Sequence, residues 1–370
     1  MSAPRFTPLA ASLPATVPFV GPEAHERATG VRFAARIGAN ENVFGPSPKA
    51  VEAMRAALEG VWTYADPENH DLRVALAEKH GVRPENIVVG EGIDGLLGLL
   101  VRLLVEPGTP VVVSRGGYPT FNYHVAGFGG AFHAVPYTED DREDIHALVE
   151  KAREVDAPLV YVANPDNPMG TWWDAAAIGD ALARLPAGTV LCLDEAYIEF
   201  APEGTAPEID VSDPRVIRMR TFSKAYGMAG MRVGYAIGHE RLVSAFDKVR
   251  NHFGMNKLAQ IAALAALEDG EWLAGTVAKV RASCERIAGI AREHGLTPIP
   301  TATNFVAIDV GGDGDTARRV VEEMARRGVF IRMAFGPPQN RCIRVSAGRE
   351  PDLELFAKAL PEALAAAREG

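Results

Sequence analysis

Residues 221–235 read TFSKAYGMAGMRVGY and lie between two apolar runs, Val216–Met219 and Val233–Ile237. Both runs are short and rich in aliphatic residues, which predicts two buried strands joined by a glycine-rich connection. Lys224 stands in this connection among small and hydroxyl-bearing residues. A lysine held partly desolvated in such surroundings has a lowered pKa and reacts with carbonyl groups to form a Schiff base.

Candidate phosphate ligands accompany this lysine. Thr221 and Ser223 precede it with hydroxyl groups, and Arg232 follows it with a fork of N–H donors suited to a phosphate. Together with the glycines, these residues indicate a site for pyridoxal phosphate. The alternative is a solvated lysine in a glycine-rich loop, which is the ordinary state of a lone lysine.

Composition narrows the class of protein. With 370 residues, 47% hydrophobic and 23% charged, the chain is long enough for two lobes and has the balance of a soluble enzyme. A net charge of −10 argues against a nucleic-acid surface and means that an anionic substrate needs a local group of arginines. We therefore expect a small-molecule enzyme that binds no nucleic acid.

Location is predicted from the cysteines and the apolar runs. The three cysteines, Cys192, Cys284 and Cys342, are far apart, which fits free thiols in a reducing cytoplasm. No apolar run approaches the roughly 20 residues of a membrane span, so we expect no membrane association. The proline-rich stretch Met1–Pro22 predicts an irregular arm and not a signal peptide.

A second glycine turn offers a phosphate cradle. The apolar run Ile87–Val89 leads into Gly90–Gly95, GEGIDG, and then into an apolar helical pattern. Amide N–H groups at such a helix start bind anions. The turn also matches Gly-x-Gly-x-x-Gly, so an NAD(P)-dependent oxidoreductase is an alternative. That fold needs an acid at the end of the next strand, where Val111–Arg115 offers only Arg115.

A third signal is an acid at a strand end. Val190–Leu193 is followed by Asp194-Glu195-Ala196-Tyr197. A carboxylate in this position can pair with a protonated pyridine nitrogen, which makes the ring an electron sink. Asp-Glu at a strand end is also typical of a nucleotide-bound metal site, but the chain lacks the Gly-x-x-x-x-Gly-Lys-Ser/Thr motif that accompanies one. The nine histidines form no His-Glu-x-x-His set, so no metal is predicted.

The segment that begins at Ser223 has the pattern Ser-Lys-Ala-Tyr-Gly-x-Ala-Gly-x-Arg-x-Gly-Tyr, and with the Asp194 segment it resembles fold type I pyridoxal-phosphate aminotransferases, most closely the histidinol-phosphate aminotransferase branch. The resemblance extends from about Asn40 to Gly348. It implies an α/β fold with a mostly parallel central sheet and a homodimer with shared active sites. We predict an N-terminal arm over 1–39 that joins the small domain, a large cofactor domain over 40–270 and a small domain over 271–370.

The resemblance implies a role for each matching residue. Lys224 forms the Schiff base, Asp194 pairs with the ring nitrogen, and Asn167 and Tyr197 contact the 3′-oxygen. The other matching residues of the same subunit are implied to contact the cofactor phosphate: Gly92, Ile93, Thr221, Ser223 and Arg232. Tyr64 is implied to reach across a dimer interface to the cofactor phosphate of the partner subunit. Tyr64 could instead be an ordinary interface or core aromatic.

Some positions depart from the family pattern. Phe121 stands where the family has the tyrosine that stacks on the cofactor ring. Phe121 could instead be a core aromatic on a short helix, and Tyr118 or Tyr123 could supply the stacking ring. Phe44 replaces a tyrosine at the substrate entrance, which removes a hydroxyl there. Asp166 replaces an asparagine next to Asn167 but leaves the expected amide donor in place.

Two arginines near the C-terminus are candidates for substrate anions. Arg344 matches the arginine that forks onto the α-carboxylate of an amino acid, and an arginine inside an apolar strand is costly without an anion. Arg332 matches a position that faces the substrate phosphate in the histidinol-phosphate enzymes. The alternative for Arg332 is a rim salt bridge with Glu322 or Glu323.

The predicted reaction is a transamination from L-histidinol phosphate to 2-oxoglutarate, with the freed Lys224 amine moving a proton between the substrate and the cofactor. Related enzymes of this branch act on aromatic amino acids or decarboxylate phosphothreonine. These activities are the nearest alternatives, and Phe44 and Phe121 favour a less polar amine. A nicotinamide oxidoreductase and a binding protein that has lost catalysis are more distant ones.

Overall fold

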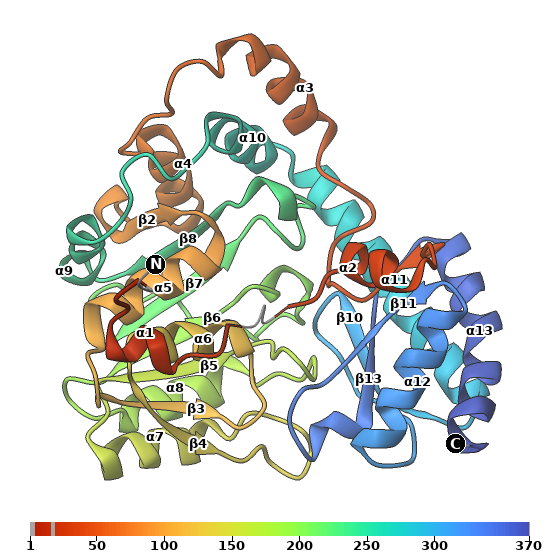
Figure 1. The fold of residues 1–370 in the computed structure, drawn as a ribbon. Coiled ribbons are helices and arrows are strands. Elements are labelled where there is room, and N and C mark those ends of the chain that lie inside the picture. The colour runs from red at the N-terminus through yellow and green to blue at the C-terminus, as the bar shows by residue number, and fades with distance from the viewer. Residues whose placement is uncertain (1–3, 16–18, 370) are drawn as a thin grey trace.

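The computed structural model describes residues 4–15 and 19–369, which form two lobes (Figure 1). The larger lobe contains a seven-stranded sheet in the order β2-β8-β7-β6-β5-β3-β4. Only β8 runs antiparallel to its neighbours, so the prediction of a mostly parallel central sheet is confirmed. The strands are β2 (Ile87–Gly90), β3 (Pro110–Ser114), β4 (Ala131–Val135), β5 (Leu159–Ala163), β6 (Val190–Asp194), β7 (Val216–Thr221) and β8 (Gly234–Gly238).

Helices cover both faces of this sheet because its strands are apolar on both sides. Val111 and Val113 pack with α5 (Gly92–Leu104) and α6 (Pro119–Gly127), whereas Val112 packs with α7 (Ile145–Val155) and α8 (Ala175–Arg184). A third cluster joins α3 (Pro48–Ala57), α4 (His70–His80) and α10 (Lys257–Leu267) to the β2–β8 end of the sheet. The short α9 (Glu240–Val243) follows β8.

The smaller lobe has its own core. Helices α11 (Gly270–Glu293), α12 (Gly314–Arg326) and α13 (Glu350–Glu369) pack with an antiparallel sheet in the order β12-β13-β10-β9. These strands are β12 (Arg332–Met333), β13 (Cys342–Ser346), β10 (Phe305–Asp309) and β9 (Thr297–Pro298). Short 3₁₀ turns occur in both lobes at Leu58–Gly60, Pro84–Asn86, Ile198–Phe200, Ala229–Met231, Ser244–Lys248 and Gln339–Arg341.

The N-terminal segment joins the smaller lobe through β1 (Ala35–Arg36), which pairs in parallel with β11 (Val329–Phe330). The prediction of an irregular arm over Met1–Pro22 is wrong at α1 (Pro8–Ser12), and a second helix, α2 (Pro22–Thr29), begins at the end of that stretch. Each helix has proline in its first turn, where the missing N–H costs nothing. Residues 1–3 and 16–18 of this arm lie outside the described residues. The domain boundaries at 39/40 and 270/271 stay predictions.

The carboxyl ends of β3, β5, β6 and β7 meet at one edge of the large sheet, because these strands run parallel. Open α/β sheets bind their ligands beyond this edge.

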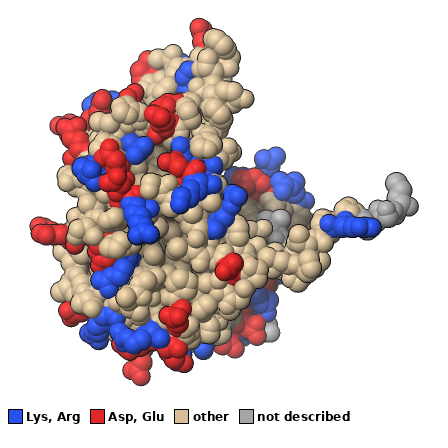
Figure 2. Space-filling view, turned by 90° about the vertical axis from the view of Figure 1, so that its left-hand side faces the viewer, with Lys and Arg blue, Asp and Glu red and all other residues tan. Residues whose placement is uncertain are grey.

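Acidic and basic side chains are interspersed on the face shown in Figure 2. Across residues 4–15 and 19–369, no helix combines the length and apolar character needed to cross a membrane.

Candidate active site

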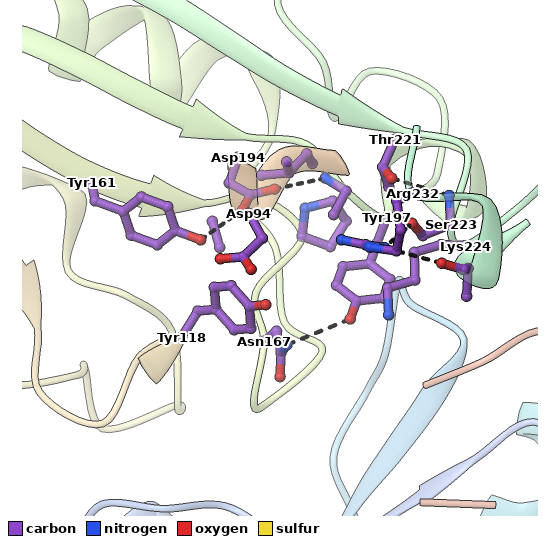
Figure 3. A pocket seen from close by; sticks show the side chains of 15 residues that line it. Asp94, Tyr118, Tyr161, Asn167, Asp194, Tyr197, Thr221, Ser223, Lys224 and Arg232 are labelled. Atoms are coloured by element: carbon purple, nitrogen blue, oxygen red, sulfur yellow. Dashed lines mark hydrogen bonds between the residues drawn. The ribbon is translucent and has the colours of Figure 1, made fainter. Parts of the chain in front are cut away.

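A cavity of about 660 Å³, including its open mouth, lies at the carboxyl edge of the large sheet (Figure 3). The side chains that line it come from the ends of separate strands and from the start of α5. They belong to Ile93, Asp94, Tyr118, Tyr161, Ala163, Pro165, Asn167, Asp194, Ala196, Tyr197, Thr221, Ser223, Lys224, Ala229 and Arg232.

Lys224 follows β7 and extends its amine into this cavity. Its Nζ donates to the backbone oxygen of Asn40 at 3.1 Å and lies 5.5 Å from the centre of the Tyr197 ring. Burial, followed by the charges of Arg344 and Arg232, lowers the pKa of Lys224 to about 8. A substantial fraction of this amine is therefore neutral, and nucleophilic, near pH 8.

Asp194 ends β6 and presents a buried carboxylate to the same cavity. Its Oδ2 accepts from the Tyr161 hydroxyl at 2.7 Å, and its Oδ1 accepts from the Ala196 N–H at 3.0 Å. Burial nevertheless raises the pKa of Asp194 to about 6. A cation placed against this carboxylate would restore its ionised form, so the site fits a protonated ring nitrogen.

One end of the cavity is suited to a phosphate. The Arg232 Nη1 donates to Ser223 Oγ at 3.3 Å and to the Ala229 oxygen at 3.0 Å. The first turn of α5 opens onto the same end, where Ile93 and Asp94 line the cavity. Gly92, at φ 78°, lies behind this turn, and a side chain there would collide with the Arg232 guanidinium. The glycine therefore allows arginine and helix start to converge.

Thr221 lines the cavity, and its hydroxyl is hydrogen-bonded to the surrounding backbone. Its hydroxyl donates to the Val233 oxygen at 3.1 Å and accepts from the Ser223 N–H at 3.0 Å. A threonine hydroxyl has only one proton to donate. Thr221 therefore holds the turn in which Ser223 stands, and the phosphate contact predicted for Thr221 stays a prediction.

Arg344 and Asn167 form the contact between the two lobes at the cavity. The Arg344 Nη1 donates to Asn167 Oδ1 at 2.6 Å, and the guanidinium carbon lies 5.0 Å from the centre of the Phe305 ring. Asn167 Nδ2 in turn lies 3.5 Å from the Tyr197 hydroxyl. Arg344 is 5% exposed, its Nε has no partner among the described residues, and burial lowers its pKa to about 10. A buried arginine without a carboxylate is ready to receive an anion.

Asn40 joins the lobes on the other side of Lys224. Its Nδ2 donates to the Tyr197 hydroxyl at 3.0 Å, and its backbone oxygen accepts from Asn304 Nδ2 at 3.0 Å as well as from Lys224. Its φ of 55° lies in the left-handed region, which asparagine tolerates. Lys224 and Tyr197 are therefore oriented by a residue that the small lobe also holds.

Arg332 lies outside the cavity lining, between the rings of Phe19 at 5.4 Å and Phe330 at 5.6 Å. Its Nη2 donates to the Val20 oxygen at 2.8 Å. The alternative of a rim salt bridge is wrong, because Glu322 pairs with Arg318 and Glu323 pairs with Arg326 and Arg327. Among the described residues Arg332 has no carboxylate partner, so its positive charge remains available.

The prediction that Phe121 lines the site is wrong. Phe121 is fully buried, and its ring stacks on that of Tyr161 at 4.4 Å and 15°. Helix α6 begins at Pro119, which leaves Tyr118, the residue before the helix, lining the cavity and turns Phe121 back into the core. Tyr118 is therefore the ring placed to stack on a ligand, and Tyr123 is 56% exposed at the surface.

Tyr64 and Phe44 do not line the cavity of their own chain. The Tyr64 side chain is 78% exposed and packs on the Phe253 ring at 4.7 Å. Phe44 packs against the core of the small lobe, and the Lys279 Nζ lies 5.8 Å from its ring. A substrate role for Phe44 and a partner-site role for Tyr64 stay predictions.

Sequence reasoning missed Tyr161 and Asp94. Tyr161 carries the one hydroxyl of the otherwise aliphatic strand Leu159–Ala163, and a buried hydroxyl needs a partner. Asp94 lines the cavity, and its Oδ1 accepts from His124 Nε2 at 2.8 Å. It stands in the Gly90–Gly95 turn, in which only the backbone amides were expected to bind a ligand. Across the part of the chain that the structure describes, no three His, Cys, Asp or Glu side chains gather as a metal site.

Comparison with known proteins agrees with this geometry. The family profile described as "Aminotransferase class I and II" matches residues 35–360. Histidinol-phosphate aminotransferase 1 of Nitrosococcus oceani is 35% identical over 342 residues, which is 92% of this chain and 91% of the relative. Histidinol-phosphate aminotransferase 2 of Ralstonia nicotianae is 36% identical over 337 residues, covering 90% of this chain and 89% of that protein.

A solved structure is more similar still. Histidinol-phosphate aminotransferase from Sinorhizobium meliloti, in complex with pyridoxal-5′-phosphate, superposes with a TM-score of 0.95 at 53% identity and covers 98% of both chains. The chain belongs to the class I and II aminotransferase family, with the fold type I architecture, and is an enzyme, a transaminase.

Asp166 is a buried carboxyl group beside the Asn167–Arg344 contact. Its Oδ1 accepts from the Tyr137 hydroxyl at 2.9 Å and its Oδ2 from the Met169 N–H at 2.8 Å. Burial raises the pKa of Asp166 to about 7. A carboxyl whose pKa is raised on folding stabilises the folded protein fully below its unfolded pKa, near 3.8, and loses that contribution as pH rises through about 7.

Asp166→Asn is therefore expected to raise the free energy of unfolding of the cofactor-free protein at pH 8 by roughly 1–3 kcal/mol. At this pH the wild-type carboxyl is largely ionised and its charge is costly to bury, whereas the amide carries no charge. Urea unfolding at pH 5 and pH 8 measures this, and the gain should shrink at pH 5. Asp180→Asn, at an exposed position on α8, is the control. Equal gains at both pH values would contradict the prediction.

Proposed function

We propose that this aminotransferase binds pyridoxal phosphate in the cavity and transfers the amino group of L-histidinol phosphate to 2-oxoglutarate. The observation that carries the proposal is the convergence on one cavity of a lysine of lowered pKa, a buried carboxylate and a phosphate-binding helix start. The related Sinorhizobium meliloti protein is described as a histidinol-phosphate aminotransferase in complex with pyridoxal-5′-phosphate, which supports both the cofactor and the donor.

The residues present fit the cofactor. Ser223, Arg232 and the first amides of α5 would hold its phosphate, and Asp194 would pair with its ring nitrogen. Tyr118 would stack on the ring, while Asn167 and Tyr197 would face the 3′-oxygen. When bound, pyridoxal phosphate supplies an aldehyde that reacts with amines and a ring that withdraws electrons.

The chain's own residues supply proton transfer and orientation. The Lys224 Nζ, with a pKa of about 8, can accept a proton at neutral to mildly basic pH and return it. Asn40 fixes the position of this amine by its backbone oxygen and that of the Tyr197 hydroxyl by its side chain. Arg344 and Asn167 bind the anionic end of the substrate and so orient the bond from which the proton leaves.

The two substrates place different anions in the same position. L-Histidinol phosphate carries a phosphate ester where an amino acid carries its α-carboxylate, whereas 2-oxoglutarate carries a carboxylate there. Arg344 would bind both anions, because a guanidinium forks onto either one. Arg332, which has no carboxylate partner among the described residues, would contribute mainly to the larger and more highly charged phosphate.

Lys224→Ala is expected to abolish turnover, with a loss of at least about 10³-fold, because no other amine lines the cavity among the described residues. The visible absorption of the cofactor-loaded protein should be lost with it. Absorption spectra and a donor–acceptor assay measure the two effects. Lys358→Ala, at an exposed position on α13, should leave both unchanged. Retained turnover in the Lys224 variant would refute the assignment.

Arg332→Gln is expected to raise the KM for histidinol phosphate by about 10- to 100-fold, because a charge-assisted contact to phosphate is lost, and to change the KM for 2-oxoglutarate by less than about threefold. Arg326→Gln, an exposed substitution on α12, is the control. A donor panel that includes L-phenylalanine and phosphothreonine tests the alternatives. Preference for phenylalanine over histidinol phosphate, or an unchanged donor KM in the variant, would contradict the donor assignment.

We also propose that the protein acts as a homodimer in which Tyr64 reaches the cofactor phosphate of the partner subunit. Large apolar side chains are exposed near Tyr64 on the segment after α3 and on the loop before α10, in contrast to the polar surface expected of a monomer. They belong to Leu58, Val61, Trp62 and Phe253.

Mixing subunits tests this arrangement. Tyr64→Ala and Lys224→Ala are expected each to give weak or inactive homodimers, whereas mixed dimers contain one site with both native residues and should regain up to about half of the wild-type activity per dimer. Activity after co-refolding of the two variants measures this. No recovery in a mixture that sediments as dimers would contradict a shared site.

Buried free Cys192, Cys284 and Cys342 favour a reducing compartment, which we propose is the cytoplasm, and cell fractionation tests this.

A further inference from the structure

We propose that Tyr161 is a positioning residue for Asp194, that Phe121 holds Tyr161 in place, and that this pair keeps the Asp194 carboxylate an anion aimed at the ring nitrogen of the cofactor. The inference rests on the proposed binding of pyridoxal phosphate. It assigns roles to a tyrosine that lines the cavity and to a fully buried phenylalanine that stacks on it.

The geometry of the hydrogen bond carries the inference. Strands β5 and β6 pair in parallel, with Ala163 opposite Asp194. Side chains two residues apart on a strand point to the same face of the sheet, so Tyr161 lies on the same face as Ala163 and Asp194. From there its hydroxyl reaches Asp194 Oδ2 at 2.7 Å. This is a charge-assisted bond, and the only other donor to the carboxylate among the described residues is the Ala196 N–H on Oδ1. Each oxygen therefore has one donor.

Phe121 restricts the tyrosine ring. Its own ring lies parallel to that of Tyr161 at a centroid distance of 4.4 Å, and both side chains are at most 2% exposed. A stacked aromatic pair allows little rotation of either ring, since the surrounding core is closely packed. The Tyr161 hydroxyl is thus held towards Asp194 by the residue that the sequence had suggested as a cofactor contact.

Tyr161 acts as a donor over the working pH range. Burial, followed by the charge of Asp194, raises its pKa well above the ordinary value, so the phenol stays neutral. Other titratable groups face Asp194 from the surrounding elements: Lys224 after β7, Cys192 on β6, Glu195 and Tyr197 just after β6, Tyr118 before α6 and Glu143 before α7. Glu195 is itself paired with Arg218 and Arg220.

Removal of this donor makes a specific prediction. In the cofactor-free Tyr161→Phe variant, Asp194 should stay protonated up to a higher pH than in the wild type, because its carboxylate loses one of its two hydrogen bonds. A cofactor that requires the anion should therefore bind about tenfold or more weakly below pH 6, and the deficit should narrow as pH rises and Asp194 ionises in both proteins. The ratio of the two affinities cancels the cofactor's own titration.

The experiment titrates cofactor-free protein with pyridoxal phosphate from pH 5 to pH 9 and follows the quenching of tryptophan fluorescence. Tyr137→Phe is the matched control, because it removes another tyrosine hydroxyl that bonds a buried carboxyl, that of Asp166. Phe121→Leu should weaken binding in the same pH-dependent way but less. Circular dichroism and thermal melts of each variant check that it is folded.

The outcomes separate this inference from the proposed function. If wild-type protein fails to bind pyridoxal phosphate, the proposed function is wrong. If wild type binds and Tyr161→Phe matches it, or is weaker by the same factor at every pH, the positioning role is refuted. A pH-dependent deficit in Tyr161→Phe that Tyr137→Phe does not share supports it.

Discussion

The buried carboxylate of Asp194 is the constraint on which the site depends. An isolated carboxylate in a protein interior is costly. Asp194 is 5% exposed, accepts from two hydrogen-bond donors and has a raised pKa. Its place at the end of β6 is set by parallel pairing with β5, which also brings Tyr161 and the Asn167 loop to it. The sheet therefore fixes where a cation will be most stabilised, before any ligand arrives.

The cations of the site are placed under the same constraint. Arg344 is buried and Lys224 is half-buried, neither has a carboxylate bonded to it among the described residues, and the charge of Arg344 helps to lower the pKa of Lys224. Neutral groups hold them instead, the backbone oxygen of Asn40 and the side-chain oxygen of Asn167. Such contacts orient a charge without neutralising it. The empty site is thus less stable than a fully paired one, and an anionic ligand recovers the difference.

The sequence predicted the parts of the site that local pattern determines. Lys224, Asp194 and Asn167 follow apolar strands, and the carboxyl ends of parallel strands meet at one edge, so their convergence was foreseeable. Phe121 was assigned wrongly because its orientation depends on where helix α6 begins, and Thr221, which lines the cavity, makes backbone hydrogen bonds that no sequence pattern shows. The pairing of Tyr161 with Asp194 joins residues 33 apart and is visible only in the register of two strands.

The partners of Arg332 bear on the choice of substrate. Had Glu322 or Glu323 paired with it, an incoming phosphate would have had to displace a carboxylate from a partly buried ion pair. Both glutamates are instead bound by arginines on or just after α12. Arg332 is left with a backbone oxygen and the faces of two rings, none of which carries a net charge. A dianionic phosphate therefore gains more from this arginine than a neutral aromatic side chain would, which favours a phosphorylated amine over an aromatic amino acid as the donor.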